Sequence, residues 1–146
     1  MAARWTTPGR WLLTLTVLFV GRVVAQPLAA LTGWRFLPPF EAWQSGALPY
    51  PGLLASQVTL VALMVWTARR IGVGQLGRSR RVGWVLAVLT GLYGGLMTGR
   101  LVLGLTSARG HWWLDAPLPT VFHLVLTTYL AIVVHHHLRE VSDVPH

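Results

Sequence analysis

Six polar side chains stand inside otherwise apolar stretches of the sequence, and their types suit the binding of a small molecule. They are two arginines, two glutamines, a tyrosine and a histidine: Arg22, Gln26, Gln57, Tyr93, Arg100 and His123. A guanidinium stays cationic at any ordinary pH, so it binds a lipid phosphate, a carboxylate or a quinone oxygen. Histidine exchanges a proton near neutral pH. These residues therefore predict a ligand-binding site, with His123 as the candidate acid or base.

The composition indicates the elements that must position these residues. The chain has 146 residues, of which 53% are hydrophobic and only 11% charged, and its mean hydropathy is +0.55. A soluble domain carries about 25% charged residues, and a helix needs about 20 apolar residues to cross a hydrocarbon core. The sequence predicts an all-α integral membrane protein, with a single four-helix transmembrane domain over 1–146 and spans at 11–31, 53–68, 82–106 and 118–137.

The distribution of arginine predicts the orientation. All 12 basic residues are arginines; the lead 1–10 holds two, the loop between the second and third spans holds five, and each other loop holds one. The positive-inside rule then places both termini in the cytoplasm, and we expect the inner (cytoplasmic) membrane of a bacterium. Because the arginines flank spans and form no separate basic face, nucleic acid is not an expected partner.

The first apolar run also has features of a cleaved signal peptide. Basic residues precede it, and Val23-Val24-Ala25 gives a small-residue pattern. However, Arg22 stands directly before that pattern and the apolar character resumes as far as Leu31. These two observations favour a retained helix.

Residues 33–52 form the longest interruption of the apolar sequence and are rich in aromatic residues and proline. Proline is favoured in the first turn of a helix, so Pro38-Pro39 followed by Phe40 to Gly46 predicts a short helix. With its aromatic residues it is expected to lie in the membrane interface, as an outward cap. We interpret the tryptophans near span ends, Trp43 included, as interfacial anchors.

The depth of each polar residue follows from the helical rise of about 1.5 Å per residue. The six polar residues then gather in the outer half of the membrane, below the cap. The outer side holds two acids, Glu41 in the cap and Asp115 in the other outer loop. Either these acids and loop carbonyls pair with the buried arginines, or some guanidinium donors remain available for a ligand, with Glu41 at the edge of its site.

A repeat of small residues occurs in the third span. Ala87, Gly91, Gly95 and Gly99 recur every four residues and lie on one helical face. Such a face lets two helix backbones approach closely. The pattern predicts that this helix is central in the bundle, or that the face meets another subunit.

Other chemistry finds little support in the sequence. His135, His136 and His137 are consecutive, so on a helix they point about 100° apart and do not converge on a metal ion. The first three spans contain no histidine to oppose His123 across a haem, and the chain has no cysteine. No metal site is predicted and no cofactor is assigned.

Two functions fit these observations. The first is a non-catalytic subunit or scaffold of a larger membrane complex, whose partner is another protein or a second copy. The second is a membrane enzyme or binding protein for an amphipathic anionic lipid or quinone-like ligand in the outer half of the bundle. The small size of the chain limits the volume it can enclose, which favours the first function and a role that is not enzymatic.

Overall fold

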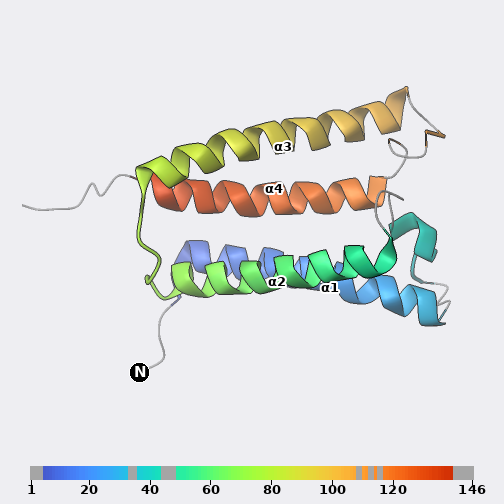
Figure 1. The fold of residues 1–146 in the computed structure, drawn as a ribbon, viewed down its shortest axis with the longest axis horizontal. Coiled ribbons are helices and arrows are strands. Elements are labelled where there is room, and N and C mark those ends of the chain that lie inside the picture. The colour runs from blue at the N-terminus through green and yellow to red at the C-terminus, as the bar shows by residue number, and fades with distance from the viewer. Residues whose placement is uncertain are drawn as a thin grey trace, which may run out of the picture.

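The computed structural model contains four long helices and one short 3-10 helix (Figure 1). In chain order they are α1 (Thr7–Thr32), η1 (Phe40–Trp43), α2 (Tyr50–Gly72), α3 (Arg80–Thr106) and α4 (Pro117–Leu138). The structure describes residues 5–32, 36–43, 49–107, 110–111, 114 and 117–139, and these contain no strand. All four long helices are long and apolar enough to cross a membrane, which confirms the predicted all-helical class and indicates an integral membrane protein.

Each long helix contains one predicted span and continues beyond it. The difference is largest in α2, which begins at Tyr50 and ends at Gly72. Pro51 lies in its first turn, where backbone N–H groups have no partner within the helix, so the N–H that proline lacks is not needed. At the other end the helix includes the cationic residues Arg69 and Arg70. The predicted span ends before them because it rests on hydropathy, whereas the backbone hydrogen bonds of the helix continue through polar residues.

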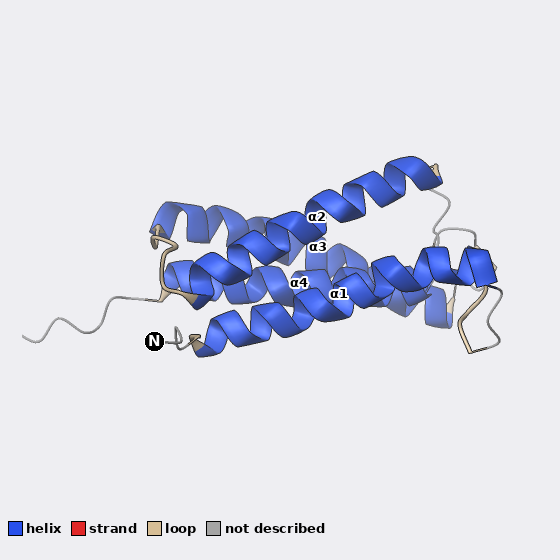
Figure 2. Cartoon of the chain, turned by 90° about the horizontal axis from the view of Figure 1, so that it is seen from below, coloured by secondary structure: helices blue, strands red, loops and turns tan. Residues whose placement is uncertain are grey.

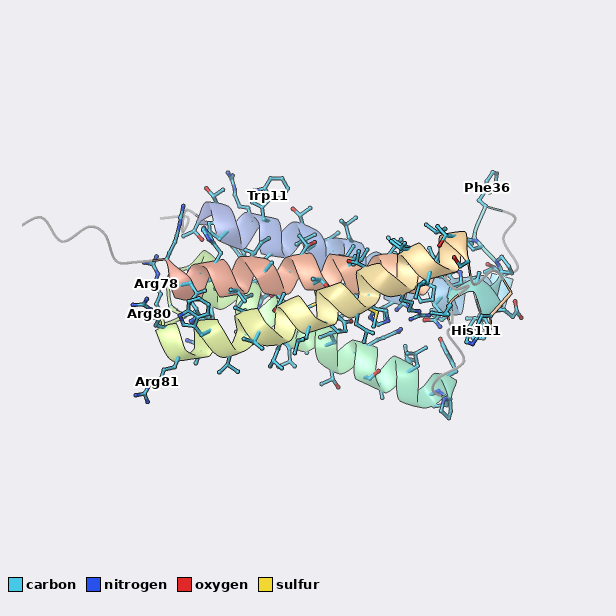
Figure 3. The ribbon with its side chains drawn as sticks, turned by 90° about the horizontal axis from the view of Figure 1, so that it is seen from above. Trp11, Phe36, Arg78, Arg80, Arg81 and His111 are labelled. Atoms are coloured by element: carbon cyan, nitrogen blue, oxygen red, sulfur yellow. The ribbon has the colours of Figure 1, made fainter. Side chains whose placement is uncertain are left out.

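The helices run alternately up and down, and two of them form the middle of the bundle. Helix α4 packs along both α1 and α3, and α2 packs along α1. The expectation that the third span is central is therefore wrong, because α3 flanks the bundle and packs mainly on α4. Towards the end that carries η1, α2 diverges from the other helices (Figures 2 and 3).

The buried apolar core occupies the half of the bundle away from η1. It consists of residues from α1, α2 and α4: Leu12, Phe19, Val23, Met64, Ala68, Ile71, Tyr129 and Val133. The hydroxyl of Tyr129 donates a 2.7 Å hydrogen bond to the carbonyl of Met64. Helix α4 is thereby tied to α2 near mid-depth, and the half of the bundle beside η1 contains buried polar residues such as Arg22 and Gln57.

Glycines mark the closest helix contacts, but not at the predicted repeat. A Cβ atom built on Gly94 would overlap the side chain of Thr127 on α4, whereas Gly91, Gly95 and Gly99 have open space beside them in the single chain. The prediction that the repeat makes a close contact inside the bundle is thus wrong. The buried face of α3 lies on the opposite side of the helix and includes Gly94.

We expect Gly94→Leu to destabilise the bundle and Gly95→Leu to leave it intact. A leucine at position 94 must displace Thr127, and overpacking of this kind costs about 1–3 kcal/mol. Thermal unfolding of the detergent-solubilised protein measures the difference. Equal melting temperatures for the two variants would contradict the contact seen between α3 and α4.

Candidate functional site

Arg22 is a buried cation held by uncharged groups. Its side chain is 7% exposed. Its Nη2 donates a 3.2 Å hydrogen bond to the carbonyl of Trp43, and its guanidinium carbon lies 5.3 Å from the ring centroid of Phe122. Its Nε has no hydrogen-bond partner, and no carboxylate of the described residues forms an ion pair with it. The guanidinium therefore keeps its charge and at least one unused donor.

The cap residue Trp43 connects η1 to two helices. Its side chain is 6% exposed, its Nε1 donates to the carbonyl of Pro38 at 3.0 Å, and its ring lies 6.5 Å from that of Phe122. The interpretation of Trp43 as an interfacial anchor is thus wrong, because the ring is buried between η1 and α4. Phe36 instead is 95% exposed and points away from the helices (Figure 3).

The predicted acids do not neutralise Arg22 in the described part of the chain. Glu41 lies on η1, is exposed, and forms no ion pair with any described residue. Asp115 lies outside the described residues, as do positions 44–46, which were predicted to end the short helix. The short helix itself is present as η1.

Two buried glutamines meet between α1 and α2. Gln57 Nε2 donates to Gln26 Oε1 at 3.4 Å, and both side chains are almost completely buried. The remaining amide atoms, Gln26 Nε2 and Gln57 Oε1, have no partner among the described residues. Rotating both amides by 180° would make Gln26 the donor and Gln57 the acceptor of the same bond. In either arrangement one amide nitrogen and one amide oxygen of the pair have no partner among the described residues.

Tyr93 and His123 form a second polar pair between α3 and α4. The Tyr93 hydroxyl lies 2.5 Å from His123 Nδ1, and the two rings meet edge to face. Arg100 is 3% exposed and is engaged by other groups of the protein. Tyr93 and His123 both line a cavity that Arg22 also lines.

A cavity of 490 Å³ joins these groups. Its polar lining comes from four helices and includes Arg22, Gln57, Tyr93 and His123, while Gln26, Arg100 and Glu41 do not line it. Its apolar lining includes Phe19, Trp43, Leu60, Leu63, Phe122 and Leu126. Small-molecule sites in proteins have volumes of about 300–1,000 Å³ and a similar balance of apolar walls with few polar groups.

The aromatic part of this lining was not predicted from the sequence. Phe19 and Phe122 look like ordinary apolar residues of a span. Trp43 contributes its backbone carbonyl oxygen to Arg22, and because every residue carries such an oxygen, the residue type does not indicate this role. Their spacing along the chain carries no signal of the contact, because Phe122 and Trp43 meet only when α4 packs beside η1.

The histidines at the other end of α4 hold a loop. His136 Nε2 lies 3.2 Å from the carbonyl of Leu76, and the amide of Ser79 donates to His137 Nδ1 at 3.2 Å. Within the described ranges, no group of three histidine, cysteine, aspartate or glutamate residues is placed to hold a metal ion. The role of His136 and His137 is to fasten the segment between α2 and α3 to the end of α4.

Comparison of the chain with protein-family models, with curated proteins and with solved structures found no match. The chemistry of the cavity is accordingly the basis for inferring a function.

The two glutamines should behave as a coupled pair. Gln26→Leu alone leaves the Gln57 amide buried without a partner, which costs about 1–3 kcal/mol. The double variant Gln26→Leu/Gln57→Leu removes both amides and should cost less than the sum of the single changes. A double-mutant cycle on thermal stability in detergent measures this coupling, and strictly additive losses would show that the two amides do not interact.

Proposed function

We propose that this chain binds an amphipathic molecule from the bilayer, with an anionic or oxygen-rich head group beside Arg22. The observation that carries the proposal is the side chain of Arg22, which lines the 490 Å³ cavity, is 7% exposed and forms no ion pair with a carboxylate of the described residues. A buried charge is costly unless it is paired and hydrogen-bonded. An oxygen of the ligand would supply the partner that the described residues do not.

The cavity is suited to a molecule with one polar and one apolar end. We place the head group beside Arg22, Gln57 and His123, which all line the cavity. The tail follows the leucines of α2 and α4, among them Leu60 and Leu126. Leu63 also lines the cavity and is 57% exposed, so the cavity reaches the outer surface of the bundle and admits the ligand sideways from the lipid.

His123 contributes a hydrogen bond to this ligand through its second ring nitrogen. When the Tyr93 hydroxyl donates to Nδ1, the neutral ring carries its proton on Nε2. That nitrogen then acts as a donor to an oxygen of the head group. We propose binding alone, without a chemical step, because no carboxylate occurs in any of the four long helices to serve as a partner base.

The placement of the protein in the membrane is part of the same proposal. Exposed arginines gather at the end of the bundle opposite η1, and Arg78, Arg80 and Arg81 extend outward there (Figure 3). Under the positive-inside rule this end faces the cytoplasm, with both termini on that side. The cavity then lies in the outer half of a bacterial inner membrane, covered by η1 in the interface.

The proposal is tested by identifying the molecule that the purified protein retains. We expect extraction from a mild-detergent preparation, followed by mass spectrometry, to yield one lipid-like or quinone-like compound at about one molecule per chain. Leu60→Trp fills the apolar part of the cavity and should reduce retention about tenfold, since it displaces apolar contacts worth more than about 1.4 kcal/mol. Arg22→Gln should also reduce retention, because the head group loses its interaction with the guanidinium.

The matched control is Val58→Trp, which adds the same ring to α2 at a residue that is exposed and does not line the cavity. This variant should retain the compound as the unaltered protein does. The same retention in Leu60→Trp and Val58→Trp would exclude the cavity as the binding site.

A second candidate function, a non-catalytic subunit of a larger complex, is favoured by the open face of α3. Gly91, Gly95 and Gly99 are exposed and have no neighbouring atoms in the single chain. Helices associate in lipid through such small residues because their backbones can approach closely. We propose that this face receives a helix of a second copy or of another protein.

Light scattering of the detergent complex measures this assembly. We expect Gly95→Leu to convert an oligomer or complex into single chains, because the added side chain separates the two backbones. Val85→Leu, which enlarges an exposed residue of α3 away from the glycines, should have no effect. A protein that is monomeric before any substitution would refute assembly with a second copy, and the absence of any co-purifying protein would refute a partner subunit.

A further inference from the structure

A second cavity lies at the opposite end of α2, outside the site described above. It measures 510 Å³ and lies on the outer face of the helix. Its apolar part is formed by Ala62, Val65, Trp66 and Val73, and its polar part by Arg69, Arg70 and Gln75. We refer to these seven residues as the α2 groove. Along α2 from Ala62 to Arg70 the lining changes from apolar to cationic.

The chain turn after α2 builds the polar end of this groove. The amide of Val73 donates to the carbonyl of Arg69 at 3.0 Å, and the amide of Gln75 donates to the carbonyl of Arg70 at 2.8 Å. Gly74 allows the turn with a φ of 70°, which non-glycine residues rarely adopt. These bonds satisfy the last carbonyls of the helix and bring Gln75 back against α2.

Arg70 contacts two other residues of the groove at the cationic end. Its Nη1 donates to Gln75 Oε1 at 3.3 Å, and its guanidinium carbon lies 5.7 Å from the ring centroid of Trp66. A guanidinium has five N–H donors, so Arg70 retains donors for a further partner. Within the described ranges, no carboxylate forms an ion pair with Arg69 or Arg70. Two adjacent cations are thus available at one place.

We propose that the α2 groove binds one anionic phospholipid of the adjoining leaflet. Its phosphate lies between Arg69 and Arg70, to which it binds through charge-assisted hydrogen bonds. Trp66 lies beside the glycerol region, where tryptophan is enriched in membrane proteins. An acyl chain follows Val65 and Ala62. The seven helical steps from Ala62 to Arg69 span about 10 Å, which is the depth from the head group into the first part of the hydrocarbon.

This site differs from a general attraction between arginine and an anionic membrane. Each basic residue near a membrane surface contributes to that attraction through its charge alone, so Arg80 and Arg81 contribute as much as Arg69 and Arg70. All four are exposed at the same end of the bundle. Only Arg69 and Arg70 line the groove, and Arg80 and Arg81 extend outward from the start of α3 (Figure 3).

The experiment compares two double variants with the same change in charge. The full chain, in detergent micelles, is titrated with phosphatidylglycerol and separately with phosphatidylcholine, and bound lipid is counted by native mass spectrometry. Arg69→Gln/Arg70→Gln should weaken the tightest phosphatidylglycerol site about tenfold or more, since two charge-assisted contacts are lost. Arg80→Gln/Arg81→Gln should change it by less than about twofold, because it removes only diffuse attraction.

Gln75→Ala provides a readout that does not change the charge. It frees the guanidinium of Arg70, so it should weaken the phosphatidylglycerol site while phosphatidylcholine binding stays the same. Equal losses in the two arginine variants would overturn the proposal in favour of diffuse charge. Equal affinity for both lipids in the unaltered protein would overturn it as well. Neither result would affect the cavity beside Arg22, which lies at the other end of the bundle.

Discussion

The burial of one cation, Arg22, determines how the half of the bundle beside η1 is built. An ion removed from water loses several kcal/mol of solvation unless other groups replace it. Two elements supply the replacement around the guanidinium that α1 carries: η1 offers the carbonyl of Trp43, and α4 offers the ring of Phe122. Because the carbonyl belongs to η1, the short helix must lie over the helix ends, and Trp43 is buried as a result.

The two ends of the bundle solve the packing problem differently. At the arginine-rich end a Cβ atom on Gly9 would overlap Gly72, and the amide of Thr6 donates to the carbonyl of Gly72 at 3.1 Å, so α1 and α2 are in direct contact. At the other end α2 diverges, and the space beside it is the cavity lined by Arg22 and His123. Helices α1 and α2 are in close backbone contact at one end, and polar side chains line the cavity at the other. This arrangement gives a chain of 146 residues a cavity of ligand size, although its small size is expected to limit the volume it can enclose.

Sequence reasoning could place residues by depth but could not decide which faces meet. The positions of Arg22, Gln57, Tyr93 and His123 near one level follow from a fixed helical rise, and the structure brings all four to one cavity. The face of α3 that contacts the bundle cannot be inferred in this way. Lipid is as apolar as a protein core, so the lipid-facing and protein-facing sides of the helix do not differ in hydrophobicity. Gly94 therefore could not be distinguished from Gly95 in advance, although of these two a Cβ atom would meet another helix at Gly94 alone.

The kind of partner that Arg22 has also bears on what the site can do. A carboxylate in contact with the guanidinium would lower the cost of burial by cancelling the charge, and the cavity would then attract an anionic oxygen only weakly. A carbonyl and an aromatic face lower the same cost through partial charges, so the full positive charge persists. Glu41, the described acid nearest in sequence to Trp43, is exposed on η1 and leaves that charge uncancelled. Since Arg22 lines the cavity, its uncancelled charge favours an anionic oxygen there.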